Sequence, residues 1–63
     1  MKYEIGDLVA YTYKSGIIYY GIVIHVQIES PQWFSVLWED DSVTMEHGQY
    51  AWITNLTKDS LES

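Results

Sequence analysis

Hydrophobic and polar residues alternate with a period of two along much of this chain, which is the pattern of β-strands. The clearest case is residues 17–29, where Ile22, Ile24, Val26 and Ile28 alternate with a mostly polar set. A helix would turn Ile22 and Ile24 to different sides, whereas a strand places them on the same face. The pattern therefore predicts a long strand with one apolar face and one mostly polar face.

Gly21 interrupts this run of β-branched and aromatic residues. An isolated glycine inside a strand often marks a bulge or a sharp bend at the corner of a barrel. We therefore expect residues 17–29 to bend at Gly21, so that one strand can belong to both sheets of a small barrel.

Four further segments have the composition of strands and are bounded by turn-forming residues. They cover residues 8–13, 33–39, 42–46 and 53–56. In the segment 33–39, alternation predicts that Phe34, Val36 and Trp38 share one face. The breaks between strands are Gly6-Asp7, Lys14-Ser15-Gly16, the segment 29–32, Asp40-Asp41 and His47-Gly48-Gln49.

Five short strands, tight turns and no credible helix predict an all-β domain that closes into a small barrel. Closure removes the exposed strand edges that would promote aggregation, and the alternative is a swapped or edge-paired dimer. The barrel is expected to occupy residues 1–56. Residues 57–63 are polar and without periodicity, which predicts a flexible C-terminal tail.

The length of 63 residues limits the size of the core. A domain this small rarely gains more than about 3–5 kcal/mol from its core, and the chain has no cysteine for a disulfide or a zinc-thiolate site. Three Trp, six Tyr and one Phe compensate with large apolar surfaces. A compact aromatic barrel is therefore plausible, as is stabilisation by a partner chain.

Charge separates the classes of possible partner. Nine acidic residues against three lysines give a formal net charge of -6. Nucleic-acid binding normally depends on lysine and arginine neutralising phosphates, so nucleic acid is an unfavoured partner. A basic peptide or protein is electrostatically easier to bind, although acidity can also serve solubility alone.

Several short motifs resemble those of Tudor-like and KOW-like SH3 barrels. They are Gly6-Asp7-Leu8-Val9 in the first strand, Gly21-Ile22-Val23 in the second, the run Val36-Leu37-Trp38-Glu39-Asp40-Asp41 at the central hairpin, and Ile53 with Leu56 in the closing strand. The layout, over about residues 5–56, is also similar to that of small barrel proteins encoded by phages of marine cyanobacteria. This resemblance implies a five-stranded SH3-like barrel with strongly bent strands and short turns. It also implies a module that binds peptides, methylated lysines or nucleic acid, or docks onto assemblies.

No segment has the length of a membrane span. The longest apolar run, residues 17–26, is far shorter than the roughly 20 residues that a bilayer requires. The first residues also lack the apolar region of a signal peptide. We therefore expect a cytoplasmic location, which for a viral protein means the host cytoplasm or the virion.

A candidate partner site lies at one end of the expected barrel. The loop after the first strand and the turn between the third and fourth strands should open on the same end, which brings together Tyr13, Tyr19, Trp38, Asp40 and Asp41. Aromatic faces beside carboxylates attract a cation. The competing interpretation is that Trp38 belongs to the core and the tyrosines cover the barrel ends.

Metal, cofactor and catalytic sites are not indicated. The acidic turn 39–41 offers fewer oxygens than calcium requires, and His25 and His47 lack the spacing of a zinc site. Cysteine nucleophiles and glycine-rich phosphate loops are absent from the sequence, and no serine is paired with a histidine by a motif. We expect a non-enzymatic protein without a cofactor.

The leading hypothesis is a small interaction module, viral in origin, that docks on a basic peptide or protein surface. The chain has more large apolar side chains than the interior of so small a barrel should hold, and an exposed apolar patch commonly marks an interface. The candidates for such a patch are Ala10 or Tyr11, Trp33, Tyr50 and Trp52. One alternative is a homo-oligomeric structural or assembly subunit. Another is an acidic mimic of nucleic acid, or a weak binder of single strands through aromatic stacking.

Overall fold

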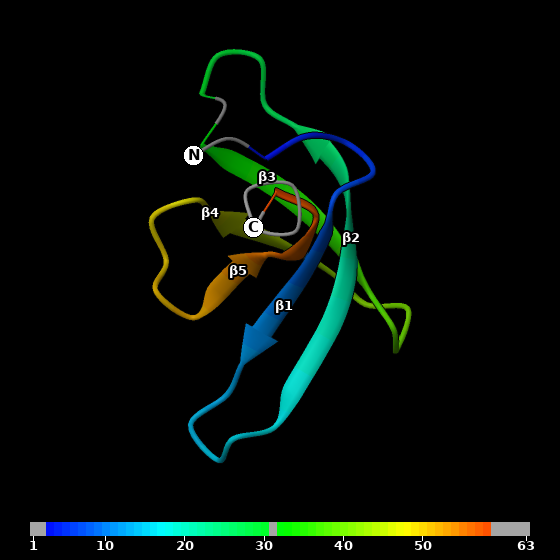
Figure 1. Cartoon of the computed structure of the whole chain (residues 1–63). Coiled ribbons are helices and arrows are strands. Elements are labelled where there is room, and N and C mark those ends of the chain that lie inside the picture. Colours follow the sequence, from blue (N-terminus) through cyan, green and yellow to red (C-terminus); the bar gives the residue numbers. More distant parts are fainter. Residues whose placement is uncertain (1–2, 31, 59–63) are drawn as a thin grey trace.

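Five antiparallel strands form one sheet in the computed structural model, which describes residues 3–30 and 32–58 (Figure 1). The strands are β1 (Leu8–Thr12), β2 (Ile18–Val26), β3 (Trp33–Trp38), β4 (Val43–His47) and β5 (Ile53–Asn55), and a helical turn covers 56–58. Their order across the sheet is β4-β3-β2-β1-β5. The all-β class and the five strands predicted from the sequence are confirmed.

The sheet curls into a half-barrel around its inner face, as Figure 1 shows. β2 is the longest strand and pairs with both β1 and β3, so it carries the curvature. Within residues 3–30 and 32–58, no strand ladder joins β4 to β5. The expected closure of the barrel by strand pairing is therefore not found, and β5 contributes a short edge of three residues.

The core fills the inner face of the curl. Phe34 and Val36 are fully buried and Trp38 nearly so, which confirms the face predicted for the third strand. Tyr3, ahead of the first strand, stacks on Phe34 with ring centroids 4.1 Å apart. The remaining buried members of this cluster are Val9, Val23 and Ile53.

Gly21 lies in regular pairing with both neighbouring strands, opposite Val9 and Trp38, so the register has no bulge at this glycine. The irregularity in β2 instead falls between Val23 and His25. Gly21 is needed for close packing: a Cβ added here would lie 2.5 Å from Val36 Cγ1 and 2.9 Å from the Leu37 carbonyl oxygen. The inner face at this point therefore has no room for any side chain.

The apolar face predicted for residues 17–29 packs on the core only in part: Val26, beyond the irregularity in β2, packs against the core cluster. Val23 is fully buried, whereas Ile22 and Ile24 lie on the exposed, outer side of the sheet. The alternation identifies the strand but not the side that faces inward, because a one-residue shift exchanges the two faces. His25 is exposed, as the sequence indicates.

Two other boundaries also differ from the sequence analysis. His47, placed there in a break, is the last residue of β4, where it pairs with Trp33 and lies against its ring with centroids 4.6 Å apart. Thr57 and Lys58, placed in the expected tail, contact the sheet: the Thr57 hydroxyl accepts a hydrogen bond from the Leu8 backbone N–H. Residues 59–63 of that tail lie outside the described residues.

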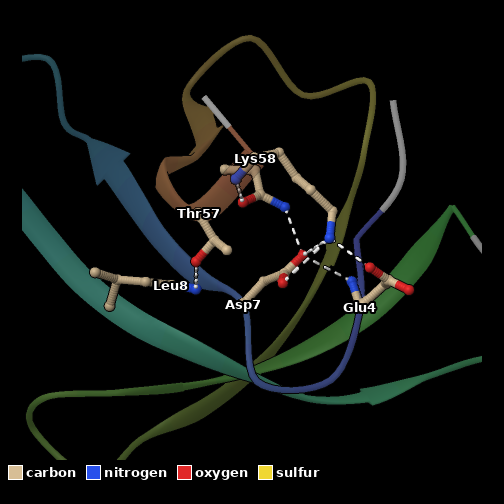
Figure 2. Close-up of polar contacts among 6 residues, drawn as sticks. Glu4, Asp7, Leu8, Thr57 and Lys58 are labelled. Atoms are coloured by element: carbon tan, nitrogen blue, oxygen red, sulfur yellow. Dashed lines mark hydrogen bonds and ion pairs between the residues drawn. The ribbon is translucent and has the colours of Figure 1, made fainter. Parts of the chain in front are cut away.

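Asp7 links the two ends of the described chain through hydrogen bonds and an ion pair (Figure 2). Its buried carboxylate accepts hydrogen bonds from Asn55 Nδ2 at 2.8 Å and from the Glu4 backbone N–H at 3.0 Å. Lys58 Nζ lies 3.4 Å from the same oxygen and also pairs with the Glu4 carboxylate. The structure thus explains the Gly6-Asp7 motif. Gly6 has a φ of 95° in the turn, and Asp7 accepts hydrogen bonds from residues near both ends of the described chain.

These contacts control the titration of Asp7. Burial alone raises the pKa of its carboxyl group, but the hydrogen bonds from Asn55 and the Glu4 backbone, together with Lys58, hold the pKa below its usual value. The hydrogen bond to Glu4, and to a smaller extent Asp7, raises the pKa of Lys58. Both groups are therefore charged near neutral pH.

Candidate functional site

An aromatic pocket of about 290 Å³ opens at the end of the inner face that lies near the β1–β2 and β3–β4 turns. Four aromatic side chains line it: Tyr11, Tyr13, Tyr19 and Trp38. Polar residues complete the lining, namely Glu39, Asp40, Ser42, Thr44 and Glu46. We call this set of nine residues the aromatic pocket.

Strand register explains why these aromatic residues meet. Tyr11 on β1 is paired with Tyr19 on β2, and two residues further along β2 Gly21 is paired with Trp38 on β3. Positions two apart on one strand share a face, so all three rings lie on the inner side. Tyr13 follows β1 into a hairpin turn closed by the hydrogen bond from its backbone N–H to the Ile17 carbonyl.

The ring of Tyr11 lies next to the other three rings. Tyr11 meets Trp38 edge-on, with centroids 5.9 Å apart and an interplanar angle of 83°. Tyr11 also lies 6.4 Å from the ring of Tyr19 and 6.2 Å from the ring of Tyr13. Trp38 is 8% exposed, whereas Tyr13 and Tyr19 are about half exposed. The pocket therefore has a buried indole at its base and accessible tyrosines at its rim.

A directional series of hydrogen bonds connects the base of the pocket to a carboxylate. Trp38 Nε1–H donates to Thr44 Oγ1 at 2.7 Å. Because the Thr44 oxygen accepts from the indole, its own hydroxyl proton is free to be donated to Glu46 Oε2, also at 2.7 Å. Thr44 and Glu46 are alternate residues of β4, so both point inward.

Glu46 is unusual among the residues of the five strands. These strands contain no Asp, no Lys and no other Glu. It is 8% exposed, and within residues 3–30 and 32–58 it makes no ion pair. A buried carboxylate is costly unless a cation or several hydrogen bonds compensate for its lost hydration. Its placement at a pocket of electron-rich rings makes the site suitable for a cation.

The β3–β4 turn adds acidic groups at the rim. Asp40 accepts hydrogen bonds from the hydroxyl and the backbone N–H of Ser42, and these bonds lower the pKa of its carboxyl group. Asp41 has a φ of 68°, a left-handed conformation that aspartate tolerates in turns. The rim therefore stays negatively charged near neutral pH.

Four of the five residues predicted for the partner site line the aromatic pocket: Tyr13, Tyr19, Trp38 and Asp40. Asp41 is not among the lining residues and instead shapes the turn. Sequence reasoning missed Tyr11, Glu39, Ser42, Thr44 and Glu46. The polar residues Thr44 and Glu46 alternate with the apolar Val43 and Met45, and this alternation is the signal that could have found the inward-facing carboxylate.

Most of the aromatic residues expected to form a spare surface pack within the domain instead. Tyr11 lines the pocket and Ala10 is buried. Trp33 and Tyr50 are half-buried and meet edge-on at 6.1 Å, and Tyr50 stacks on Trp52 at 4.6 Å. Trp52 remains 44% exposed. The exposed apolar surplus is largely aliphatic and lies on the outer face of the sheet.

Neither the models of known protein families nor the curated proteins match this chain. In the part of the chain that the structure describes, no group of three or more His, Asp or Glu side chains is placed to hold a metal ion. The described residues also contain no helix with the length and hydropathy needed to cross a membrane.

Proposed function

We propose that this protein is a non-enzymatic interaction module that binds a cationic side chain of a partner peptide or protein in the aromatic pocket. The observation that carries the proposal is the buried Glu46 carboxylate, which lies without a counter-ion in the described chain and lines the same pocket as four aromatic side chains. The strand order, in which β5 pairs with β1 beside a β1–β4 meander, supports assigning the half-barrel to the SH3-like class.

The expected energies fit recognition of a single side chain. A hydrogen bond from a cation to a carboxylate contributes about 1.5–3 kcal/mol. A cation over an aromatic face adds about 0.5–2 kcal/mol, depending on desolvation. Together these terms amount to about 2–5 kcal/mol, which corresponds to a dissociation constant of about 0.2 mM or weaker for one side chain. A partner must therefore add contacts outside the pocket to bind tightly.

Chemistry also selects among cations. Glu46 has one oxygen engaged by Thr44, and its other oxygen can accept a hydrogen bond from an N–H donor. Lysine and arginine carry such donors, whereas trimethyllysine interacts through the rings and by charge alone. The net charge of -6 should steer either kind of cation toward the protein, and this attraction should weaken as salt concentration rises.

Binding of a lysine-containing peptide is expected to fall about tenfold in Glu46→Gln, because a neutral amide replaces the charged acceptor. Fluorescence anisotropy of a labelled peptide measures this change. A peptide with acetyl-lysine at the same position has no charge and should bind wild type more weakly than the lysine peptide.

Glu39→Gln is the matched control, since it removes the same charge from the exposed rim of the same pocket. It should weaken binding only slightly, because an exposed charge is screened by solvent. Equal losses in the two variants, or equal binding of the lysine and acetyl-lysine peptides, would refute the role of the buried carboxylate.

A further inference from the structure

The outer face of the sheet is apolar where a solvent-facing sheet is normally polar. Eight large apolar side chains on this face are exposed, from 38% at Leu37 to 56% at Val43. They are Leu8, Ile18, Tyr20, Ile22, Ile24, Leu37, Val43 and Met45. Strands with apolar residues on both faces are typical of sheets that are covered on both sides.

The strand register gathers these residues into a continuous surface. Leu8 is paired with Ile22, Ile22 with Leu37, and Leu37 with Val43, so one row of four aliphatic side chains crosses β1, β2, β3 and β4. Paired residues of antiparallel strands point to the same side. A contiguous exposed apolar surface of this kind marks an interface, whereas single exposed apolar residues do not.

Charge identifies the kind of partner that this face suits. Glu46 is the one Asp, Glu or Lys in the five strands, and it points inward, so the outer face carries none of these residues. The acidic residues lie instead in turns and near the chain ends, such as Glu39, Asp40 and Asp41 in the β3–β4 turn. A face without Asp, Glu or Lys offers little attraction to a basic or an acidic partner.

We propose that the outer face is the interface of a homodimer, in which two copies pack through the row Leu8, Ile22, Leu37 and Val43. Two chains of net charge -6 repel each other, and a face without acidic residues allows contact with the least repulsion. The acidic β3–β4 turn lies at one end of the sheet, so packing with opposed strand directions keeps the two turns apart. Such a two-fold contact places the same patch on both copies.

Size gives a second reason for self-association. A standard interface buries about 800 Å² on each partner, which is about a fifth of the 4520 Å² that this chain exposes. The eight exposed apolar side chains of this face are spread over four of the five strands. Small domains without disulfides commonly obtain stability from oligomerisation, and this chain has no cysteine.

Sedimentation equilibrium at neutral pH tests the dimer. The wild-type mass is expected to rise from 7.4 kDa toward twice that value between micromolar and millimolar concentration. Ile22→Glu places a charge at the centre of the row and should stay at the monomer mass over the same range. Ser15→Glu adds the same charge in the exposed β1–β2 turn and should associate at least tenfold more tightly than Ile22→Glu.

Near-UV circular dichroism verifies that each variant is folded, and Val43→Glu, at an exposed edge position, replaces Ile22→Glu if the latter unfolds. The proposal is overturned if wild type remains at 7.4 kDa up to millimolar concentration, or if the folded row variant associates as wild type does. The dimer does not depend on the proposed function, because the aromatic pocket lies on the opposite face. Ile22→Glu should therefore bind the lysine peptide like wild type.

Discussion

Gly21→Ala is expected to destabilise the folded protein by about 1–3 kcal/mol, because it inserts a methyl group into a fully packed inner face. The new Cβ would lie 2.5 Å from Val36 Cγ1, 2.8 Å from Trp38 Cε3 and 2.9 Å from the Leu37 carbonyl oxygen. A backbone oxygen held in the β2–β3 ladder cannot rotate away as a side chain could. The loss is large beside the roughly 3–5 kcal/mol that a core of this size supplies.

Urea denaturation followed by tryptophan fluorescence measures this loss, with Gly48→Ala as the matched control. At Gly48 the nearest atom to an added Cβ is Tyr3 Cε1 at 3.5 Å, which is an ordinary contact, so the control should unfold near the wild-type midpoint. If both variants share the wild-type midpoint, the close packing described for β2 and β3 is wrong. Gly21→Ala should also weaken peptide binding, since Trp38 must shift.

Asp7→Asn is the second substitution with a large expected effect, a loss of about 1.5–3 kcal/mol. The charged acceptor for Asn55 Nδ2 and for the Glu4 backbone N–H is replaced by a neutral amide, and Lys58 loses one of its two partners. Because Asn55 is fully buried, its amide cannot turn to water instead. Chemical denaturation at pH 7 measures the loss.

The same variant should change how stability depends on acid. The folded-state pKa of Asp7 is lowered, so the stability that its charge contributes is fully present above the unfolded-state pKa of about 3.9. It is lost as the pH falls from there through the lower folded-state pKa. Wild type should therefore lose stability below about pH 4 more steeply than Asp7→Asn.

Asp41→Asn provides the control for net charge, because asparagine also tolerates the left-handed conformation of that turn. It should keep both the stability of wild type at pH 7 and the steep loss in acid. Parallel acid profiles for wild type and Asp7→Asn would show that the contacts of Asp7 do not stabilise the fold.

The fold was largely predictable because strand periodicity and turn chemistry are local properties. The face of β3 that carries Phe34, Val36 and Trp38 followed from alternation alone. The inward side of β2 could not be predicted, because Ile22 and Ile24 of its apolar set face outward whereas Val26, beyond the irregularity, packs on the core. The close approach of Val36 and Trp38 to Gly21 determines which side of β2 faces the core. This tertiary contact cannot be recognised from the sequence around Gly21.

The pocket was predictable as far as it depends on adjacent turns. Tyr13, Tyr19, Trp38 and Asp40 come together because the β1–β2 and β3–β4 turns lie at the same end of the sheet. The Glu46 carboxylate depends instead on the register of β4 against β3, in which Phe34 pairs with Glu46. A polar residue on a core-facing position breaks the usual pattern, and such violations are concentrated at functional sites.

The most direct test of the cation pocket is the Trp38 indole Nε1–H resonance in proton–nitrogen NMR spectra of labelled protein. The spectra are recorded during addition of a lysine-rich peptide, its trimethylated form and a short single-stranded DNA. Because this N–H donates to Thr44 and so connects to Glu46, a lysine bound in the pocket should shift it, while the indole resonances of Trp33 and Trp52 stay in place. An unchanged Trp38 resonance with both peptides, or the same shift with DNA, would contradict the account.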